Sequence, residues 1–85
     1  KQALRLRDPL SKRTLDVFTT ERCVQMYTAW HWEPAIVSRT GPLRRSQTLA
    51  IEPQCVADAA NHPNFPQCTL RPGEVYRNAM EWRFS

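Results

Sequence analysis

Short stretches in which apolar and polar residues alternate one by one restrict the fold of this chain more than any other feature. Leu4 and Leu6 alternate with arginines until Asp8 and Pro9 interrupt the pattern. The longest alternation lies between residues 74 and 84, and one of its faces carries Tyr76, Asn78, Met80, Trp82 and Phe84. A period of two is typical of a β-strand, because successive side chains of a strand point to opposite faces. The sequence therefore predicts strands and no helix.

The segment 13–20 is a second strand candidate, and it is rich in β-branched residues. Its two expected faces carry Leu15 with Val17 and Asp16 with Phe18. A turn at residues 21–22 would lead directly into another apolar-rich segment, residues 23–30. We expect these early segments to form an antiparallel meander.

The middle of the chain is predicted to consist of loops around one further strand. Residues 33–47 include Pro34 and show little periodicity, so they predict a long loop. Residues 48–54 predict a short buried strand, and residues 55–68 an ordered loop braced by prolines. A turn is expected at residues 71–73, where Pro and Gly are adjacent.

The net charge of +4 comes from 12 Arg and Lys residues against 8 acidic residues, and basic residues cluster near the start and near the middle of the chain. Neither cluster is interleaved with aromatic residues or embedded in a known motif, so nucleic-acid binding is not favoured. No stretch approaches the roughly 20 apolar residues of a membrane span. Solvated strand faces and loops account for the charge.

Three cysteines, Cys23, Cys55 and Cys68, cannot all pair within one chain, and they lack C-x-x-C spacing. Together with His31 and His62 they match no standard metal site, so no metal is expected. We expect three reduced, mostly packed thiols in a cytoplasmic protein.

Five or six strands without further polypeptide leave edges unpaired and one face of each strand uncovered. The chain begins at Lys1 rather than Met, which is typical of a processed or excised product. We therefore expect an incomplete β-sandwich that needs an upstream polypeptide to cover it.

Four blocks of sequence resemble one known family. They are Val24–Thr28 (VQMYT), Leu49–Gln54 (LAIEPQ), Asp58–Pro66 (DAANHPNFP) and Leu70–Tyr76 (LRPGEVY). In this order and at these spacings they resemble the C-terminal part of the aldose 1-epimerases, or galactose mutarotases. The resemblance runs from about Leu4 to Phe84 and implies that residues 1–85 are the C-terminal segment of an antiparallel β-sandwich (supersandwich).

The resemblance also implies a reaction and roles for two residues. Glu52 would be the general base that removes the proton from the anomeric hydroxyl of a hexose, so that the ring opens and recloses as the other anomer. Gln25, on the neighbouring strand, would hydrogen-bond a sugar hydroxyl. The acid histidine would come from the upstream polypeptide, and no cofactor is needed.

Departures from the family pattern leave alternative functions open. Neither His31 nor His62 stands at the position of the acid histidine. Trp30 and Trp32, which flank His31, fit a sugar-stacking platform or a core or subunit contact. Pro53 replaces a Thr, which affects the aim of Gln54. The alternatives are an epimerase of a phosphorylated sugar, bound by Arg39, Arg44 and Arg45, and a non-catalytic sugar-binding or structural subunit.

Overall fold

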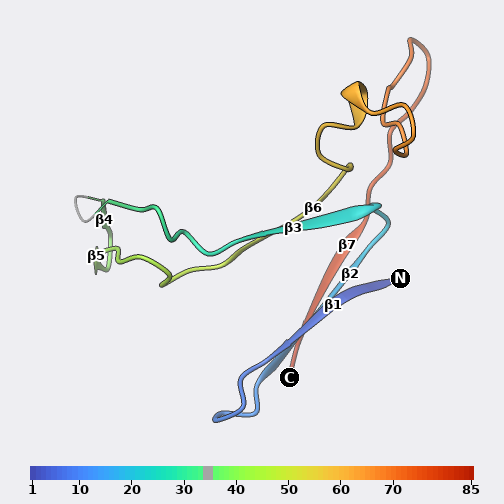
Figure 1. Cartoon of the computed structure of the whole chain (residues 1–85). Coiled ribbons are helices and arrows are strands. Elements are labelled where there is room, and N and C mark those ends of the chain that lie inside the picture. The colour runs from blue at the N-terminus through green and yellow to red at the C-terminus, as the bar shows by residue number, and fades with distance from the viewer. Residues whose placement is uncertain (34–35) are drawn as a thin grey trace.

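Seven β-strands and one short helical turn make up residues 1–33 and 36–85, the part of the chain that the computed structural model describes (Figure 1). In chain order they are β1 (Gln2–Arg7), β2 (Thr14–Thr19), β3 (Cys23–Tyr27), β4 (Val37–Ser38), β5 (Gly41–Pro42), β6 (Ala50–Gln54), the 3-10 turn η1 (Ala59–Asn61) and β7 (Met80–Phe84). Every strand pairing is antiparallel, which confirms the predicted all-β class.

The larger sheet has the strand order β1-β2-β7, and one of its faces is apolar. Leu4 pairs with Val17, which pairs with Trp82 on its other side, and Leu15 pairs with Phe84. The alternation predicted for these segments is therefore confirmed. Val17 in the central strand is 0% exposed, whereas Phe84 in the edge strand is 76% exposed.

The opposite face of the larger sheet carries a charged row. Asp16 accepts hydrogen bonds from the Arg5 guanidinium at 2.6 and 2.8 Å and from the Gln2 amide at 2.7 Å. The hydrogen bond from Arg5 lowers the pKa of Asp16. Arg83 is the register partner of Asp16 on β7, and its guanidinium lies 4.4 Å from the centroid of the Phe18 ring. These partners explain why the Asp16 carboxylate is buried while charged.

A second sheet consists of β3 and β6 alone. The predicted meander is wrong beyond β2, because β3 pairs with β6 and not with β2. β1 and β7 occupy both edges of β2, so no hydrogen-bonding edge of β2 remains for β3. A bend at residues 20–22, in which the Glu21 amide donates to the Thr19 hydroxyl at 3.0 Å, takes the chain from one sheet to the other.

The segment predicted as a long loop contains a small hairpin, so that prediction is wrong in part. Val37 pairs with Pro42 and Ser38 with Gly41. Gly41 has a φ of +119°, which suits glycine, and its carbonyl accepts a hydrogen bond from the Ser38 hydroxyl at 2.9 Å. Pro34, which contributed to the loop prediction, lies outside the described residues.

The final strand is shorter than the alternation predicted. It begins at Met80, and residues 74–79 have no strand partner among those that the structure describes. The reason is that β2 ends at Thr19. Beyond it, Thr20 bonds Ala79, accepting from its amide at 3.0 Å and donating to its carbonyl at 3.1 Å, and the Thr20 hydroxyl donates to Oδ1 of Asn78 at 3.2 Å. The predicted turn before this segment is confirmed, with Gly73 at a φ of +86°.

Residues 55–68, here called the Pro-braced loop, double back on themselves. Cys55 and Cys68 at its two ends form a disulfide with a Cα–Cα distance of 6.2 Å, and Cys23 is a free thiol. The expectation of three reduced thiols is therefore wrong. The loop can close because its chain reverses at η1 and because the Gln67 amide donates to three backbone carbonyls inside it. Those carbonyls belong to Ala59 at 2.8 Å, His62 at 3.0 Å and Phe65 at 3.1 Å.

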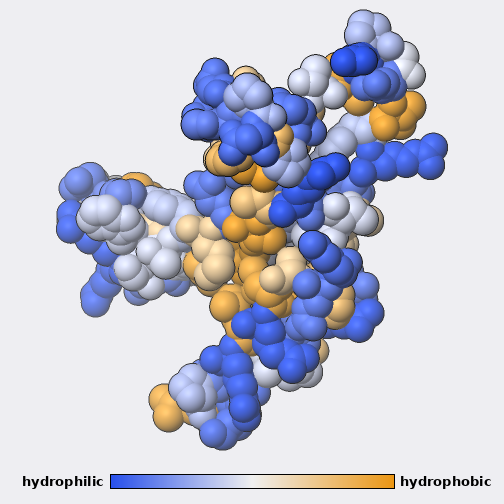
Figure 2. Space-filling model, turned by 45° about the vertical axis from the view of Figure 1, so that its right-hand side comes forward, coloured by the Kyte–Doolittle hydropathy of each residue, from blue (hydrophilic) through white to orange (hydrophobic). Residues whose placement is uncertain are grey.

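The molecule as a whole is open. Its radius of gyration is 16.7 Å, against about 12 Å for a compact domain of this length. Apolar side chains gather at the centre of the molecule, and hydrophilic arms project from there (Figure 2). Among the described residues, no helix is long and apolar enough to cross a membrane.

Candidate functional site

The second sheet brings the two expected site residues together. Glu52 on β6 and Gln25 on β3 are direct register partners. Directly opposed residues of an antiparallel pair have Cβ atoms about 5 Å apart and point to the same face. Both side chains are exposed. A carboxylate and an amide therefore stand side by side on one surface, as a site for a polyhydroxylated ligand requires.

We call this surface the Glu52 face. By strand alternation it carries Cys23, Gln25, Tyr27, Ala50, Glu52 and Gln54. The opposite face of the second sheet carries mainly apolar residues, Val24, Met26, Ile51 and Pro53. One side of the sheet is thus polar enough to meet a ligand, and the other is suited to contact with protein.

Gln54 is aimed at Gln25. Its Nε2 donates a hydrogen bond to Oε1 of Gln25 at 3.1 Å, which leaves the Gln25 amide nitrogen to donate elsewhere. Pro53, whose effect on Gln54 was uncertain from the sequence, lies within β6 and pairs with Val24. A proline is tolerated there because β6 is an edge strand and Pro53 needs no donor on its free side.

The Glu52 carboxylate makes no hydrogen bond or ion pair with any residue in the ranges 1–33 and 36–85. Its lone pairs are therefore open to an incoming hydroxyl. This differs from Asp16 in the larger sheet, whose carboxylate oxygens are occupied by Arg5 and Gln2. Of these two strand carboxylates, only Glu52 is both exposed and without a hydrogen-bond partner among the described residues.

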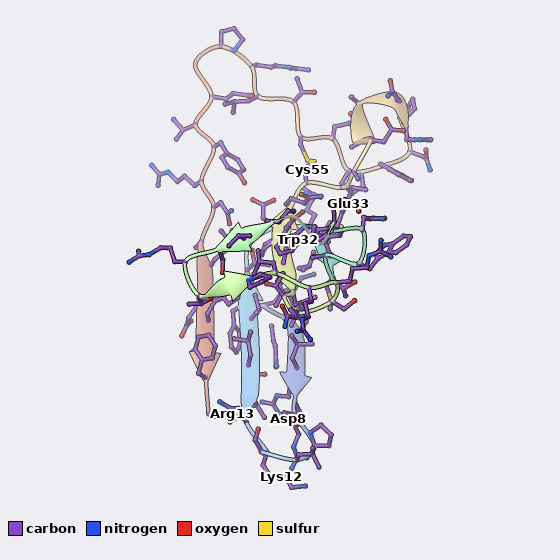
Figure 3. All side chains as sticks on the ribbon, turned by 90° about the vertical axis from the view of Figure 1, so that its left-hand side faces the viewer. Asp8, Lys12, Arg13, Trp32, Glu33 and Cys55 are labelled. Carbon is purple, nitrogen blue, oxygen red and sulfur yellow. A yellow bond between two sulfur atoms is a disulfide. The ribbon has the colours of Figure 1, made fainter. Side chains whose placement is uncertain are left out.

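Aromatic rings continue the Glu52 face. Tyr27 stacks on His31 with ring centroids 5.7 Å apart, and Trp30 lies against His31 at 3.8 Å. Trp30 is 58% exposed, so it is not part of a core within this chain. Trp32, labelled in Figure 3, is half-buried, and its carbonyl accepts a hydrogen bond from Nε of Arg45 at 3.3 Å.

The two histidines are engaged with neighbours of their own. His62 lies in the Pro-braced loop, with its Nε2 3.1 Å from Oδ2 of Asp58 and its ring stacked on Phe65 at 4.8 Å. His31 is held between Tyr27 and Trp30. Neither histidine forms a hydrogen bond or ion pair with Glu52, in keeping with the departure from the family pattern noted in the sequence.

A cleft of about 830 Å³ lies behind the Pro-braced loop and was not anticipated from the sequence. Its wall includes both disulfide cysteines, Gln67, the bend at residues 20–22 and the segment 74–77. Tyr76 donates a hydrogen bond to Glu21 across it, and this bond raises the pKa of Tyr76. The sequence did not indicate which backbone carbonyls Gln67 bonds, because Gln67 lies in a segment without periodicity.

Comparisons with known proteins identify the family of the chain. The family model described as aldose 1-epimerase matches residues 1–83. Galactose mutarotase of Mus musculus is 35% identical over 100% of this chain and 25% of its own length, and that of Homo sapiens is 34% identical over 95% and 24%. Aldose 1-epimerase of Escherichia coli K12 is 37% identical over 86% of this chain and 22% of its own length.

The chain thus spans about a quarter of the length of these curated relatives. No solved structure matches it. The family model covers nearly every residue, including β3 and β6 with Gln25 and Glu52. The chain belongs to the aldose 1-epimerase family.

Proposed function

We propose that residues 1–85 are the C-terminal segment of an aldose 1-epimerase that interconverts the α and β anomers of a hexose. The observation that carries this proposal is the pairing of Gln25 and Glu52 on an exposed face of the second sheet. Family membership supplies the reaction class, and the open carboxylate supplies a group that fits it.

In the proposed reaction Glu52 is the general base. Its carboxylate takes the proton from the anomeric hydroxyl while an acid protonates the ring oxygen, and the bond between C1 and the ring oxygen breaks. The open-chain aldehyde then rotates about C1–C2. Addition of the hydroxyl to the other side of C1, with both protons returned, gives the other anomer. Gln25 orients the sugar through a hydroxyl, and Gln54 holds the Gln25 amide in place.

We further propose that an upstream polypeptide supplies the acid histidine and covers the sheets. The accessible surface is 7180 Å² for a mass of 9.9 kDa. That is about 2,000 Å² more than the roughly 5,200 Å² expected of a compact monomer of this mass. A surplus of this size supports a large, permanent interface. Trp82 and Phe84, 42% and 76% exposed, are natural contacts for it.

The test begins with the native mass of the purified material, which shows whether a second polypeptide is bound. Polarimetry on freshly dissolved α-galactose or α-glucose then measures mutarotation. Glu52→Gln keeps the shape of the side chain and removes the base, so we expect the catalysed rate to fall by about 100-fold or more. Glu33→Gln, the same change at another exposed glutamate, is the matched control and should leave the rate within about twofold.

A rate that survives in Glu52→Gln would overturn the proposed role of Glu52. An assembled protein that binds hexose without mutarotation would be the non-catalytic subunit considered from the sequence.

The structure offers little support for the hypothesis that the substrate is a phosphorylated sugar. Arg45 donates to the carbonyl of Trp32, and Arg39 and Arg44 are exposed in and beside the β4–β5 hairpin. Comparing mutarotation of glucose with that of glucose 6-phosphate on the same material distinguishes the two substrate classes.

A further inference from the structure

The disulfide lies directly beside the candidate site. Cys55 is the residue after Gln54, the last residue of β6, and Cys68 lies 13 residues further along the chain. In Figure 3, Cys55 is labelled where the second sheet passes into the Pro-braced loop. The bond therefore connects the end of the strand that carries Glu52 to the far end of this loop.

The end of β6 has few other restraints. β6 has β3 as its one strand partner in the described chain, and Pro53 has no amide hydrogen to contribute to a ladder. Beyond Gln54 the chain leaves the sheet. The covalent bond at Cys55 thus acts where the backbone hydrogen bonding of the strand is weakest.

The loop that the disulfide closes has hydrogen bonds of its own. The Gln67 amide, adjacent to Cys68, holds the carbonyls of Ala59, His62 and Phe65, and η1 adds a hydrogen bond from the Asn61 amide to the Asp58 carbonyl at 3.0 Å. A loop with its own internal hydrogen bonds transmits a restraint, whereas a slack loop would not. The disulfide consequently ties β6 to a unit that keeps its shape.

From this geometry we propose that the Cys55–Cys68 disulfide is a redox-dependent clamp that positions Glu52 and Gln54. It is a positioning element and does not touch the sugar. In the oxidised form β6 is held against β3 with Gln54 on Gln25. In the reduced form the Cys68 end of the Pro-braced loop moves away from the end of β6, and Glu52 loses its fixed distance from Gln25. The catalytic consequence rests on the proposed function, whereas the conformational one does not.

The redox step balances with a thiol–disulfide partner. On oxidation the two thiols lose two protons and two electrons to a disulfide oxidant, which is reduced to two thiols. On reduction, one thiolate of a dithiol attacks the Sγ of Cys68 and releases the Cys55 thiolate, and the second thiolate then releases Cys68 as the dithiol closes to a disulfide. Cys68 is exposed, and both cysteines line the cleft of about 830 Å³, so a small dithiol has access to the bond.

The first measurement counts thiols in the full purified protein. Alkylation with iodoacetamide in denaturant and without reductant should label one thiol of this chain, Cys23, and prior reduction with dithiothreitol should raise the count to three. A Cys23→Ser variant should then label none without reductant, which identifies the free residue. Three labelled thiols in the unreduced protein, purified without reductant, overturn the proposal.

The second measurement asks whether the bond positions β6. Amide hydrogen exchange in residues 50–54 should be at least about fivefold faster after reduction, or in Cys68→Ala, than in the oxidised protein. Exchange in β1 and β2 should stay unchanged, and dithiothreitol should not affect Cys68→Ala further. Equal exchange of residues 50–54 in the oxidised and reduced protein overturns the clamp.

The activity readout separates the two proposals. If the oxidised protein mutarotates hexose, reduction should lower kcat by about threefold or more, and Cys68→Ala should show the lower value with or without dithiothreitol. An unchanged kcat would overturn the clamp. Faster exchange on reduction in a protein that never mutarotates would instead overturn the proposed function and leave the clamp in place.

Discussion

Val17→Ala tests whether the larger sheet has the core that its register implies. Val17 is 0% exposed and lies between Leu4 and Trp82 in the central strand. Removing the equivalent of two methylene groups costs about 1.6 kcal/mol at about 0.8 kcal/mol each. The unfilled space adds about 1 kcal/mol. The free energy of unfolding should therefore fall by about 2–3 kcal/mol.

Urea unfolding followed by far-UV circular dichroism measures this change, and at about 1 kcal/mol per molar urea the midpoint should fall by about 2–3 M. The matched control is Val75→Ala, the same deletion at a side chain that is 74% exposed, which should cost less than about 0.5 kcal/mol. If both variants lose the same stability, Val17 is not in a packed core and the reasoning about the sheet is wrong.

Two further predictions concern charge and backbone. The hydrogen bond from Arg5 lowers the pKa of Asp16, so the pair stabilises the fold fully above the unfolded-state pKa of about 3.9 and loses this effect as the pH falls through the pKa of the folded state. Between about pH 4 and pH 2 the free energy of unfolding should therefore fall more in the wild type than in Asp16→Asn. Equal pH dependence of the two proteins would contradict the pairing. Gly73 has a φ of +86°, and nothing lies within 4 Å of an added Cβ, so Gly73→Ala should lower the free energy of unfolding by about 1 kcal/mol through backbone strain alone. Thermal unfolding measures this loss. Gly73→Asn is the comparison and should lose less, because Asn tolerates a positive φ.

Local pattern predicted the faces of the strands but not their partners. The faces of β2, with Leu15 and Val17 opposite Asp16 and Phe18, follow from a period of two that any extended segment obeys. The choice between β3 and β7 as the second neighbour of β2 depends on segments far apart in the sequence. No local sequence signal indicates which of the two strands pairs with β2, and the strand nearer in sequence, β3, was the wrong prediction.

The candidate site, too, was predicted only in part from the sequence. Motif resemblance predicted that Gln25 and Glu52 lie on neighbouring strands, and the register makes them direct partners. The disulfide was missed because three cysteines without a spacing motif carry no information about which of them pair. The hydrogen bond from Gln54 to Gln25 could not be predicted either, because it depends on the register of two strands that are separated by the β4–β5 hairpin.

The position of β7 in the larger sheet has a consequence for how the chain folds. β2 pairs with β7 although these strands lie near opposite ends of the sequence, whereas β1 and β2 are joined by a short turn. Bringing distant segments together costs loop-closure entropy before any contact compensates for it, and pairings of this kind slow folding. We therefore expect the β1–β2 hairpin to form early and β7 to join it in a later, slower step. Until then one edge of the central strand is open to other chains, which makes this interval the one in which the protein is most prone to aggregate.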